Sequence, residues 1–130
     1  MLAVDTNVIV RYLARDDPRQ TPQAEQVLRT REILVLKTVL IETEWVLRYS
    51  YGFGRDLIAA ALQGLAGLPT IAFEDQSAVA QALEWFATGM DFADALHLAS
   101  SASAGRFATF DRKLAASAKR RGTTNVMLLS

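Results

Sequence analysis

Four acidic residues, Asp5, Glu42, Asp94 and Asp111, stand where apolar segments of the chain give way to helix-like or turn-like segments. Asp5 and Asp111 each end a short apolar run that is typical of a strand. Glu42 lies one turn into the helix expected after the second strand, and Asp94 opens the helix before the fourth. Functional groups of open α/β sheets gather beyond the carboxyl ends of the strands, where strand order reverses. If these strands are neighbours, the four side chains share one crevice.

Such a cluster of carboxylates predicts a metal site. Two carboxylates ~4 Å apart repel by about 4 kcal/mol at an effective dielectric constant of about 20, which is comparable with much of a domain's net stability. A cation must then lie between them, or some of them must be protonated. With one histidine and no cysteine, the ligands would be oxygens, which favours Mg²⁺ or Mn²⁺ over zinc or copper. Such ions activate water and neutralise a phosphodiester, so the expected chemistry is phosphoryl hydrolysis.

Composition excludes several other classes of protein. The 130 residues, 51% of them hydrophobic, suffice for one domain with a substantial core. The 14 basic and 14 acidic residues balance, so a nucleic acid would have to be bound by local basic patches. The absence of cysteine excludes disulfides, thiolate zinc sites and cysteine nucleophiles. The chain shows neither a signal peptide nor the roughly 18 apolar residues of a membrane span, so we expect a cytoplasmic protein.

The spacing of apolar residues predicts five strands that alternate with helices. Short apolar runs are typical of buried strands, and apolar residues that recur every three or four positions are typical of amphipathic helices. Strands separated by helices, often two at a time, predict a mainly parallel sheet that helices cover on both faces. We therefore expect one α/β domain over residues 1–130. The expected strands cover residues 2–4, 33–36, 70–73, 106–110 and 125–129.

Each of the four acids also has an ordinary structural interpretation. Asp5 is a good N-cap residue, Asp94 suits the positive end of a helix dipole, and Asp111 can begin a turn. Glu42 is harder to explain in this way, because an acid beside the apolar Ile41 is poorly placed for full solvation. One shared site explains all four positions at once.

Other polar residues carry weaker signals. Glu74 and Asp75 also follow a strand, but that strand is expected at a sheet edge, so we assign them to helix capping. His97 follows Asp94 by three residues, yet a lone histidine is more often packed or exposed than catalytic. Glu44 follows Glu42 by two positions and therefore points to a different side of the helix. We expect Glu44 to face the solvent.

Aromatic and basic side chains complete the set of candidates. The two tryptophans, Trp45 and Trp85, are expected in the core. A basic cluster near the C-terminus and two arginines on the first helix flank the expected crevice, where they would steer a phosphate backbone. These basic residues are Arg11, Arg15, Lys113, Lys119, Arg120 and Arg121.

At these residues the chain resembles the PIN-domain nucleases, and among them the VapC-type toxins of prokaryotic toxin–antitoxin systems. The resemblance covers nearly the whole chain and rests on four segments in the expected order: AVDTNVIVRYL, VLIETEWVLR, DFADALHLA and FATFDRKL. The first and last are weak alone, but the ordered set is specific. The family's acidic quartet falls on the four acids, and its small polar supporting residues fall on Thr6, Asn7 and Thr109. Asp91 is an additional acid that some members share.

The resemblance implies a three-layer α/β/α PIN-like fold with a central, mainly parallel five-stranded sheet. It also implies RNA cleavage that depends on Mg²⁺, with Mn²⁺ as a substitute, homodimerisation, and inhibition by a small antitoxin protein encoded beside the toxin. In this interpretation Asp5 and Asp94 are the primary metal ligands. Asp111 and Glu42 complete the site by binding a second ion or orienting the attacking water.

Two other functions are compatible with parts of this pattern. A PIN-like module that binds RNA or protein without cutting would be indicated by the loss of an acid, and none is lost. A haloacid-dehalogenase-like phosphatase also begins with a strand that ends in aspartate. That family needs a second aspartate two positions later, where this chain has Asn7.

Overall fold

The computed structural model describes residues 1–130 and confirms the α/β class. Five short strands alternate with seven α-helices and one 3₁₀ helix, η1, and every expected strand is present in slightly shorter form. The elements are β1 (Leu2–Ala3), α1 (Thr6–Ala14), α2 (Gln20–Thr30), β2 (Ile33–Val35), α3 (Lys37–Tyr49), α4 (Arg55–Ala66), β3 (Ile71–Phe73), α5 (Gln76–Ala87), α6 (Phe92–Ser100), η1 (Ala102–Ala104), β4 (Phe107–Thr109), α7 (Arg112–Arg120) and β5 (Val126–Leu128).

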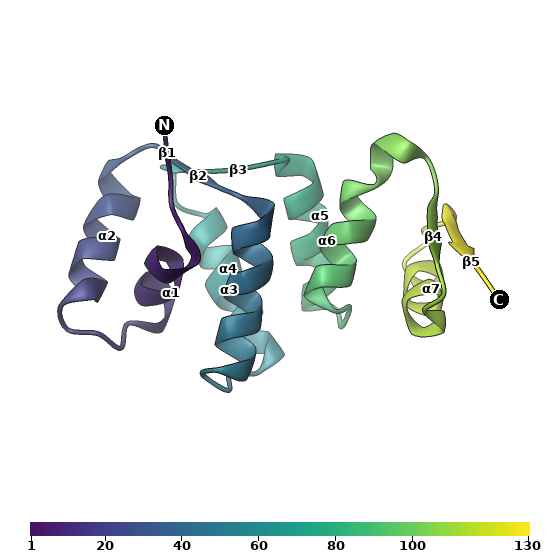
Figure 1. The fold of residues 1–130 in the computed structure, drawn as a ribbon, viewed down its shortest axis with the longest axis horizontal. Coiled ribbons are helices and arrows are strands. Elements are labelled where there is room, and N and C mark those ends of the chain that lie inside the picture. Colours follow the sequence, from purple (N-terminus) through teal and green to yellow (C-terminus); the bar gives the residue numbers. More distant parts are fainter.

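All paired strands are parallel, but they form two sheets where the sequence suggested one five-stranded sheet. The first sheet has the order β1-β2-β3, with β3 at an edge as expected, and β4 pairs with β5 alone. In Figure 1 the first sheet runs along the upper side of the molecule from α2 towards α5, whereas β4 and β5 lie at the right-hand end, beyond α5 and α6. Each strand pairs over only two or three residues, so few hydrogen bonds favour a larger sheet. An apolar run predicts a strand but does not specify its neighbour.

One hydrophobic core of 23 buried residues runs from the end of β1 to α7. Ile33 and Val35 of β2 are fully buried, as expected for the central strand of a parallel sheet. Helices α5 and α6 pack closely, with the rings of Phe86 and Phe92 edge to face at 5.4 Å between centroids. No helix combines the length and the hydropathy that a transmembrane segment needs.

Helix α3 buries a different face from the one that its aromatic spacing suggests. Trp45, expected in the core, is 53% exposed, whereas Glu44, expected in solvent, is only 3% exposed. Leu40 and Leu47 occupy the core side of the helix, which turns Glu44 inward and Trp45 outward. Two stripes of four-residue spacing compete on this helix, and spacing alone does not choose between them. Trp85 of α5 is half-buried and packs against the core.

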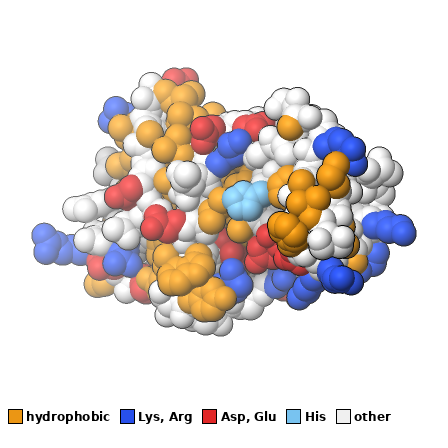
Figure 2. Space-filling model, turned by 45° about the vertical axis from the view of Figure 1, so that its right-hand side comes forward, with side chains coloured by type: hydrophobic (Ala, Val, Ile, Leu, Met, Phe, Trp, Pro, Cys, Tyr) orange, Lys and Arg blue, Asp and Glu red, His pale blue; other side chains and the backbone are white.

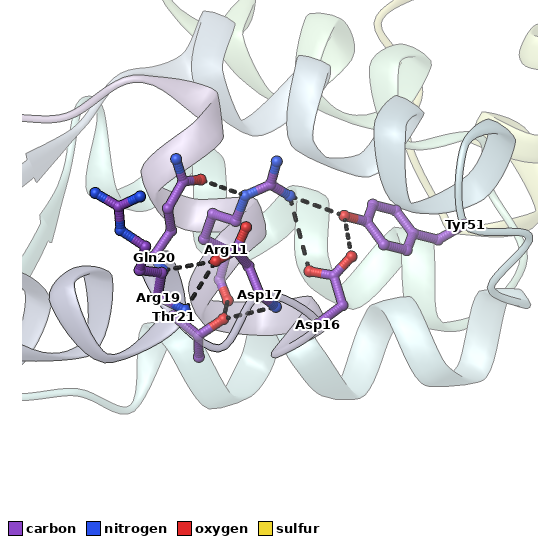
Figure 3. Close-up of polar contacts among 7 residues, drawn as sticks. All are labelled: Arg11, Asp16, Asp17, Arg19, Gln20, Thr21 and Tyr51. Atoms are coloured by element: carbon purple, nitrogen blue, oxygen red, sulfur yellow. Dashed lines mark hydrogen bonds and ion pairs between the residues drawn. The ribbon is translucent and has the colours of Figure 1, made fainter.

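A polar network fixes the turn between α1 and α2 (Figure 3). Asp17 Oδ1 accepts a hydrogen bond from the backbone N–H of Gln20 at 2.7 Å, which satisfies a free donor at the start of α2. Arg11 Nη1 donates to the Tyr51 hydroxyl at 3.1 Å, and this hydroxyl donates to Asp16 Oδ2 at 2.8 Å. The network therefore ties α1 to the loop that follows α3.

The two arginines of α1, which were expected to steer a phosphate backbone, are bound to partners within the fold. Arg11 Nε also donates to Gln20 Oε1 at 2.7 Å, and Arg15 Nη2 donates to Glu25 Oε2 at 3.0 Å. Both guanidinium groups thus have partners within the chain. The sequence places these arginines on one helix face but does not reveal the partners that the α1–α2 turn brings to them.

Candidate active site

The first two candidate acids lie where α1 begins and α3 runs beside it. Asp5 is the N-cap of α1, and its Oδ1 accepts a hydrogen bond from the Val8 backbone N–H at 3.3 Å. Thr6 is buried and donates its hydroxyl to Glu42 Oε1, as expected of a supporting residue. Glu42 is exposed, contrary to the expectation of poor solvation. Asn7 is exposed as well, and its side chain does not support a candidate acid in the way that Thr6 does.

The other two candidate acids lie at the starts of α6 and α7. Asp91 is the N-cap of α6, and its Oδ2 accepts a hydrogen bond from the Asp94 backbone N–H at 3.1 Å. Asp111 is the N-cap of α7, and its Oδ1 accepts from the Leu114 backbone N–H at 3.0 Å. The Thr109 hydroxyl accepts from the Asp111 backbone N–H at 2.9 Å. Capping uses one carboxylate oxygen of Asp111 and leaves the other free for a further partner, whereas the second oxygen of Asp91 lies near Arg48.

Asp94 lies in an electrostatic environment that disfavours its ionised form. Burial raises the pKa of its carboxyl, and the nearby charges of Asp91 and Asp111 raise this pKa further. His97 and Lys113 act in the opposite direction but less strongly. Like-charged neighbours and partial burial both disfavour the ionised carboxylate. This end of the site therefore favours a cationic group close to Asp94.

The structure does not bring the four acids into one crevice as expected. No group of three or more histidine, aspartate or glutamate side chains lies close enough to hold a metal ion. Asp5 and Glu42 belong to α1 and α3, whereas Asp94 and Asp111 belong to α6 and α7. The shared crevice required β1 and β4 to be neighbours, and these strands lie in different sheets. As placed, the four acids do not fit a single metal ion, and this arrangement supports no reaction step through one.

A cavity of about 340 Å³ opens beside the second pair of acids and has Asp94 in its wall. Four basic and two acidic side chains line it, so its charge is net positive. Lys113 and Arg120 take part in no ion pair within the chain, whereas Arg55 donates to two backbone carbonyls at 2.9 and 2.7 Å. The cavity therefore suits an anionic group held close to a carboxylate. Its lining residues are Arg48, Arg55, Gly89, Met90, Asp91, Asp94, Lys113, Leu114, Ser117 and Arg120.

Only part of the C-terminal basic cluster contributes to this cavity. Lys113 and Arg120 line it, and Lys119 does not. Arg121 donates Nη2 to the Thr88 carbonyl at 2.9 Å and Nη1 to the Ser117 hydroxyl at 2.6 Å, so it fastens α7 to the end of α5. A helix places successive basic residues on different sides, which explains this division.

Cavity size alone does not identify the site. A larger cavity of about 430 Å³ lies between α5, α6 and the segment before β5, and none of the four acids lines it. Its wall includes small residues such as Ala99 and Ser100 and the half-buried Trp85. We therefore assign the candidate site to the smaller cavity, which combines a carboxylate of raised pKa with free cations.

A partly buried ion pair, which was not expected from the sequence, supports the wall of the candidate site. Arg48 Nε lies 2.8 Å from Glu44 Oε2, and Arg48 Nη2 lies 3.9 Å from Asp91 Oδ1. Burial raises the pKa of Glu44, and the charge of Arg48 opposes that rise. The available signal was a glutamate four residues before an arginine on one helix. The pair fixes Arg48 at the cavity.

The surface around α6 gathers the residue types that this chemistry needs. Figure 2 shows the single histidine, His97, at the surface, with acidic side chains just below it. Basic side chains border the lower edge of the same face, and a hydrophobic patch lies to the lower left. His97 is exposed, which is one of the two ordinary placements, packed or exposed, that the sequence suggested.

Comparison with models of known protein families matches residues 2–124 to the PIN domain. The chain belongs to the PIN domain family. PIN domains are generally nucleases that bind nucleic acids and typically use divalent metal ions. The match spans all four candidate acids, which supports the PIN-domain nuclease over the dehalogenase-like phosphatase. A search of curated proteins finds no match for this PIN domain.

Proposed function

We propose that the protein is an endoribonuclease that hydrolyses RNA phosphodiester bonds, with Asp5, Glu42, Asp94 and Asp111 as its catalytic acids. The observation that carries this proposal is the cavity beside α6. It combines Asp94, a carboxylate of raised pKa, with two cations that have no partner in the chain. Membership of the PIN domain family supports the same reaction class.

The charges of the cavity suggest how an RNA phosphate is positioned. Lys113 and Arg120 lie on the α7 side of the cavity and offer donors for the phosphate oxygens, while Arg48 and Arg55 supply positive charge from α3 and α4. Cations that contact phosphate fix the position of a nucleic acid without reading its sequence. The scissile phosphate would then lie beside the carboxylate of Asp94.

We propose Mg²⁺ as the cofactor, with Mn²⁺ as a substitute, on the basis of the oxygen-only ligand set and the family. The acids are divided between two parts of the molecule, so the active form must bring the two pairs to one phosphodiester. Helix α3 packs against both α1 and α6 and thus connects these two parts.

We further propose that the enzyme is the toxin of a toxin–antitoxin pair and acts as a cytoplasmic homodimer. The four ordered segments that resemble VapC-type toxins support the toxin role. A cognate antitoxin would silence the enzyme by placing an arginine or lysine near the acids while burying an apolar segment nearby. The charge would inhibit, and the apolar contact would supply most of the affinity.

The nuclease proposal is tested with purified protein and labelled RNA. The wild type should cleave RNA with added Mg²⁺ and lose that activity in excess chelator, and Asp94→Asn should be inactive under both conditions. Asn keeps the shape of the side chain but not its charge, so circular dichroism should show an unchanged fold. A wild type that cuts no RNA with either Mg²⁺ or Mn²⁺ leaves the non-catalytic binding module as the better interpretation.

The toxin proposal is tested separately by expression in cells. The wild type should arrest growth when expressed alone and be harmless together with the small protein encoded beside it, with a stable complex recovered. Asp5→Asn should be harmless alone and still bind that partner, because apolar burial dominates the affinity. A wild type that is harmless at high expression and co-purifies with no neighbouring product contradicts the toxin role and leaves the nuclease untouched.

A further inference from the structure

Two large aromatic side chains project from α3 into solvent. Trp45 is 53% exposed and Tyr49 is 62% exposed, and their ring centroids lie 5.1 Å apart with the planes inclined at 44°. Other apolar residues of α3 face the core and hold the helix in place. The fold therefore does not require the two aromatic side chains to be exposed. Glu42 is exposed three residues before Trp45 and seven before Tyr49, a spacing that places all three on one side of the helix. The aromatic pair therefore borders one of the candidate acids.

The same aromatic pair also borders the cavity, through Arg48. The guanidinium carbon of Arg48 lies 4.6 Å from the centroid of the Tyr49 ring, and Arg48 lines the cavity that contains Asp94. The buried Glu44 carboxylate holds this guanidinium from behind. A continuous surface thus runs from the Asp94 cavity over Arg48 to the two rings and on to Glu42.

We propose that Trp45 and Tyr49 form a platform, here the aromatic platform, on which an unpaired base of a single-stranded RNA substrate stacks. The inference rests on the proposed nuclease function and names its substrate class. A strand whose phosphate occupies the cavity would place the adjoining base over Arg48 and the rings. Aromatic side chains beside a basic groove are the usual means of binding single strands without sequence readout. A base paired in a duplex cannot reach the rings in this way.

A nucleic acid fits this surface better than a second protein does. Stable protein interfaces bury about 800 Å² on each partner, whereas two rings offer at most roughly 150–250 Å² each. The other large exposed hydrophobic side chains lie on other elements, so they do not extend the platform into a broad apolar face. The platform adjoins a net positive cavity, which attracts a polyanion. A second copy of this chain carries no net charge, so it offers no overall attraction to the positive cavity.

The test uses the fluorescence of Trp45 in the full-length protein. The chain has two tryptophans, so Trp85→Phe leaves Trp45 as the sole reporter. In excess chelator, which prevents cleavage, an unstructured RNA oligonucleotide should quench this fluorescence. An abasic oligonucleotide with the same number of phosphates, and the duplex form of the same RNA, should not. Quenching of equal size by the abasic strand would show that phosphate charge alone acts on Trp45, which overturns the stacking proposal.

Binding by substituted proteins provides the second arm. Trp45→Ala and Tyr49→Ala should each weaken single-strand binding at least about fivefold, the lower end of what stacking of one base contributes. Trp45→Phe should retain most of the affinity, and Leu57→Ala, which removes an equally exposed side chain from α4, should change nothing. Unchanged affinity in the Trp45→Ala, Tyr49→Ala double variant overturns the proposal. So does a wild-type dimer that Trp45→Ala converts to a monomer, because the platform is then an interface between copies.

These results separate the platform from the nuclease reaction. If base-dependent quenching occurs but the wild type cuts no RNA with added metal, the platform stands and the proposed catalytic function fails. If the wild type cuts RNA and the double variant binds and cuts equally well, the nuclease stands and the platform fails. Circular dichroism of each variant confirms that the exposed substitutions leave the fold intact.

Discussion

At the scale of single residues, the candidate acids combine a structural task with a chemical one. Asp5 and Asp111 each cap a helix through one oxygen, which confirms the N-cap interpretation of Asp5, whereas Asp111 begins a helix and not a simple turn. Capping does not use the second oxygen, and the acid therefore stays available to a ligand. Asp94 caps nothing and lies between Asp91, Asp111 and the cavity. Burial and these like charges raise the pKa of Asp94, so the fold disfavours the ionised form of this carboxyl.

Asp94→Asn should therefore make the metal-free protein more stable near neutral pH. The folded state raises the pKa of Asp94 above its unfolded value, so ionisation opposes folding wherever the pH exceeds the raised pKa. As the pH falls through that pKa, the wild-type carboxyl takes up a proton and the advantage of the variant should disappear. The gain should be no more than a few degrees in Tm, because Asp94 is partly exposed.

Thermal denaturation across this pH range, in the presence of chelator, measures the effect. Asp56→Asn is the matched control, since Asp56 is an exposed acid in the first turn of α4. This control should not gain stability, because the helix dipole favours the lost charge. A Tm of Asp94→Asn equal to or below that of the wild type near neutral pH would contradict the electrostatic description of the site.

Among the elements, the sequence predicted the strands, most helices and the caps Asp5 and Asp75, but not which face of α3 is buried. Short apolar runs and helix-start residues are local signals, and they were sufficient for the strands and for Asp75 at the start of α5. Packing is not local, and both Trp45 and Leu47 fit an apolar stripe on α3. Likewise, Glu74 reaches the start of α3 from a distant part of the chain, a contact that local sequence does not reveal.

Glu74→Ala should lower the free energy of unfolding by about 1 kcal/mol, which is typical for the loss of a helix cap. Glu74 Oε1 accepts a hydrogen bond from the Lys37 backbone N–H at 2.9 Å, and Leu36 at the N-cap position offers no side-chain acceptor. Urea denaturation measures the change, with Glu84→Ala of α5 as an exposed glutamate control. Equal stability of the two variants would show that the Lys37 N–H does not need this partner.

At the scale of the whole molecule, the separation of the two sheets explains why the four acids could be predicted but not their arrangement. The identity of each acid follows from its place after a strand or within a helix, which local sequence encodes. Whether the acids meet depends on whether β1 and β4 pair, and two- or three-residue strands carry little information about their neighbours. The structure leaves one edge of β1 and one edge of β4 unpaired.

Hydrogen exchange should detect the free edge of β4. The Phe107 backbone N–H donates to the Asn125 carbonyl at 2.9 Å, so in a parallel ladder the N–H of the next residue, Ala108, points away from β5. Ala108 should therefore exchange much faster than Phe107 in the free protein, and this adjacent residue is its own control. Equal, strong protection of both amides would show that β4 has a second neighbour in solution.

We propose that the two separated pairs of acids serve one reaction. Rates of RNA cleavage with added Mg²⁺ should be compared for the wild type, Asp5→Asn, Asp111→Asn and the double variant. Asn preserves both helix caps, so all four proteins should remain folded. Each single substitution should remove nearly all activity, and the double variant should be no worse than either, because residues that act as a unit are not additive. Cleavage by Asp5→Asn at the wild-type rate would contradict the claim and confine the chemistry to Asp94 and Asp111.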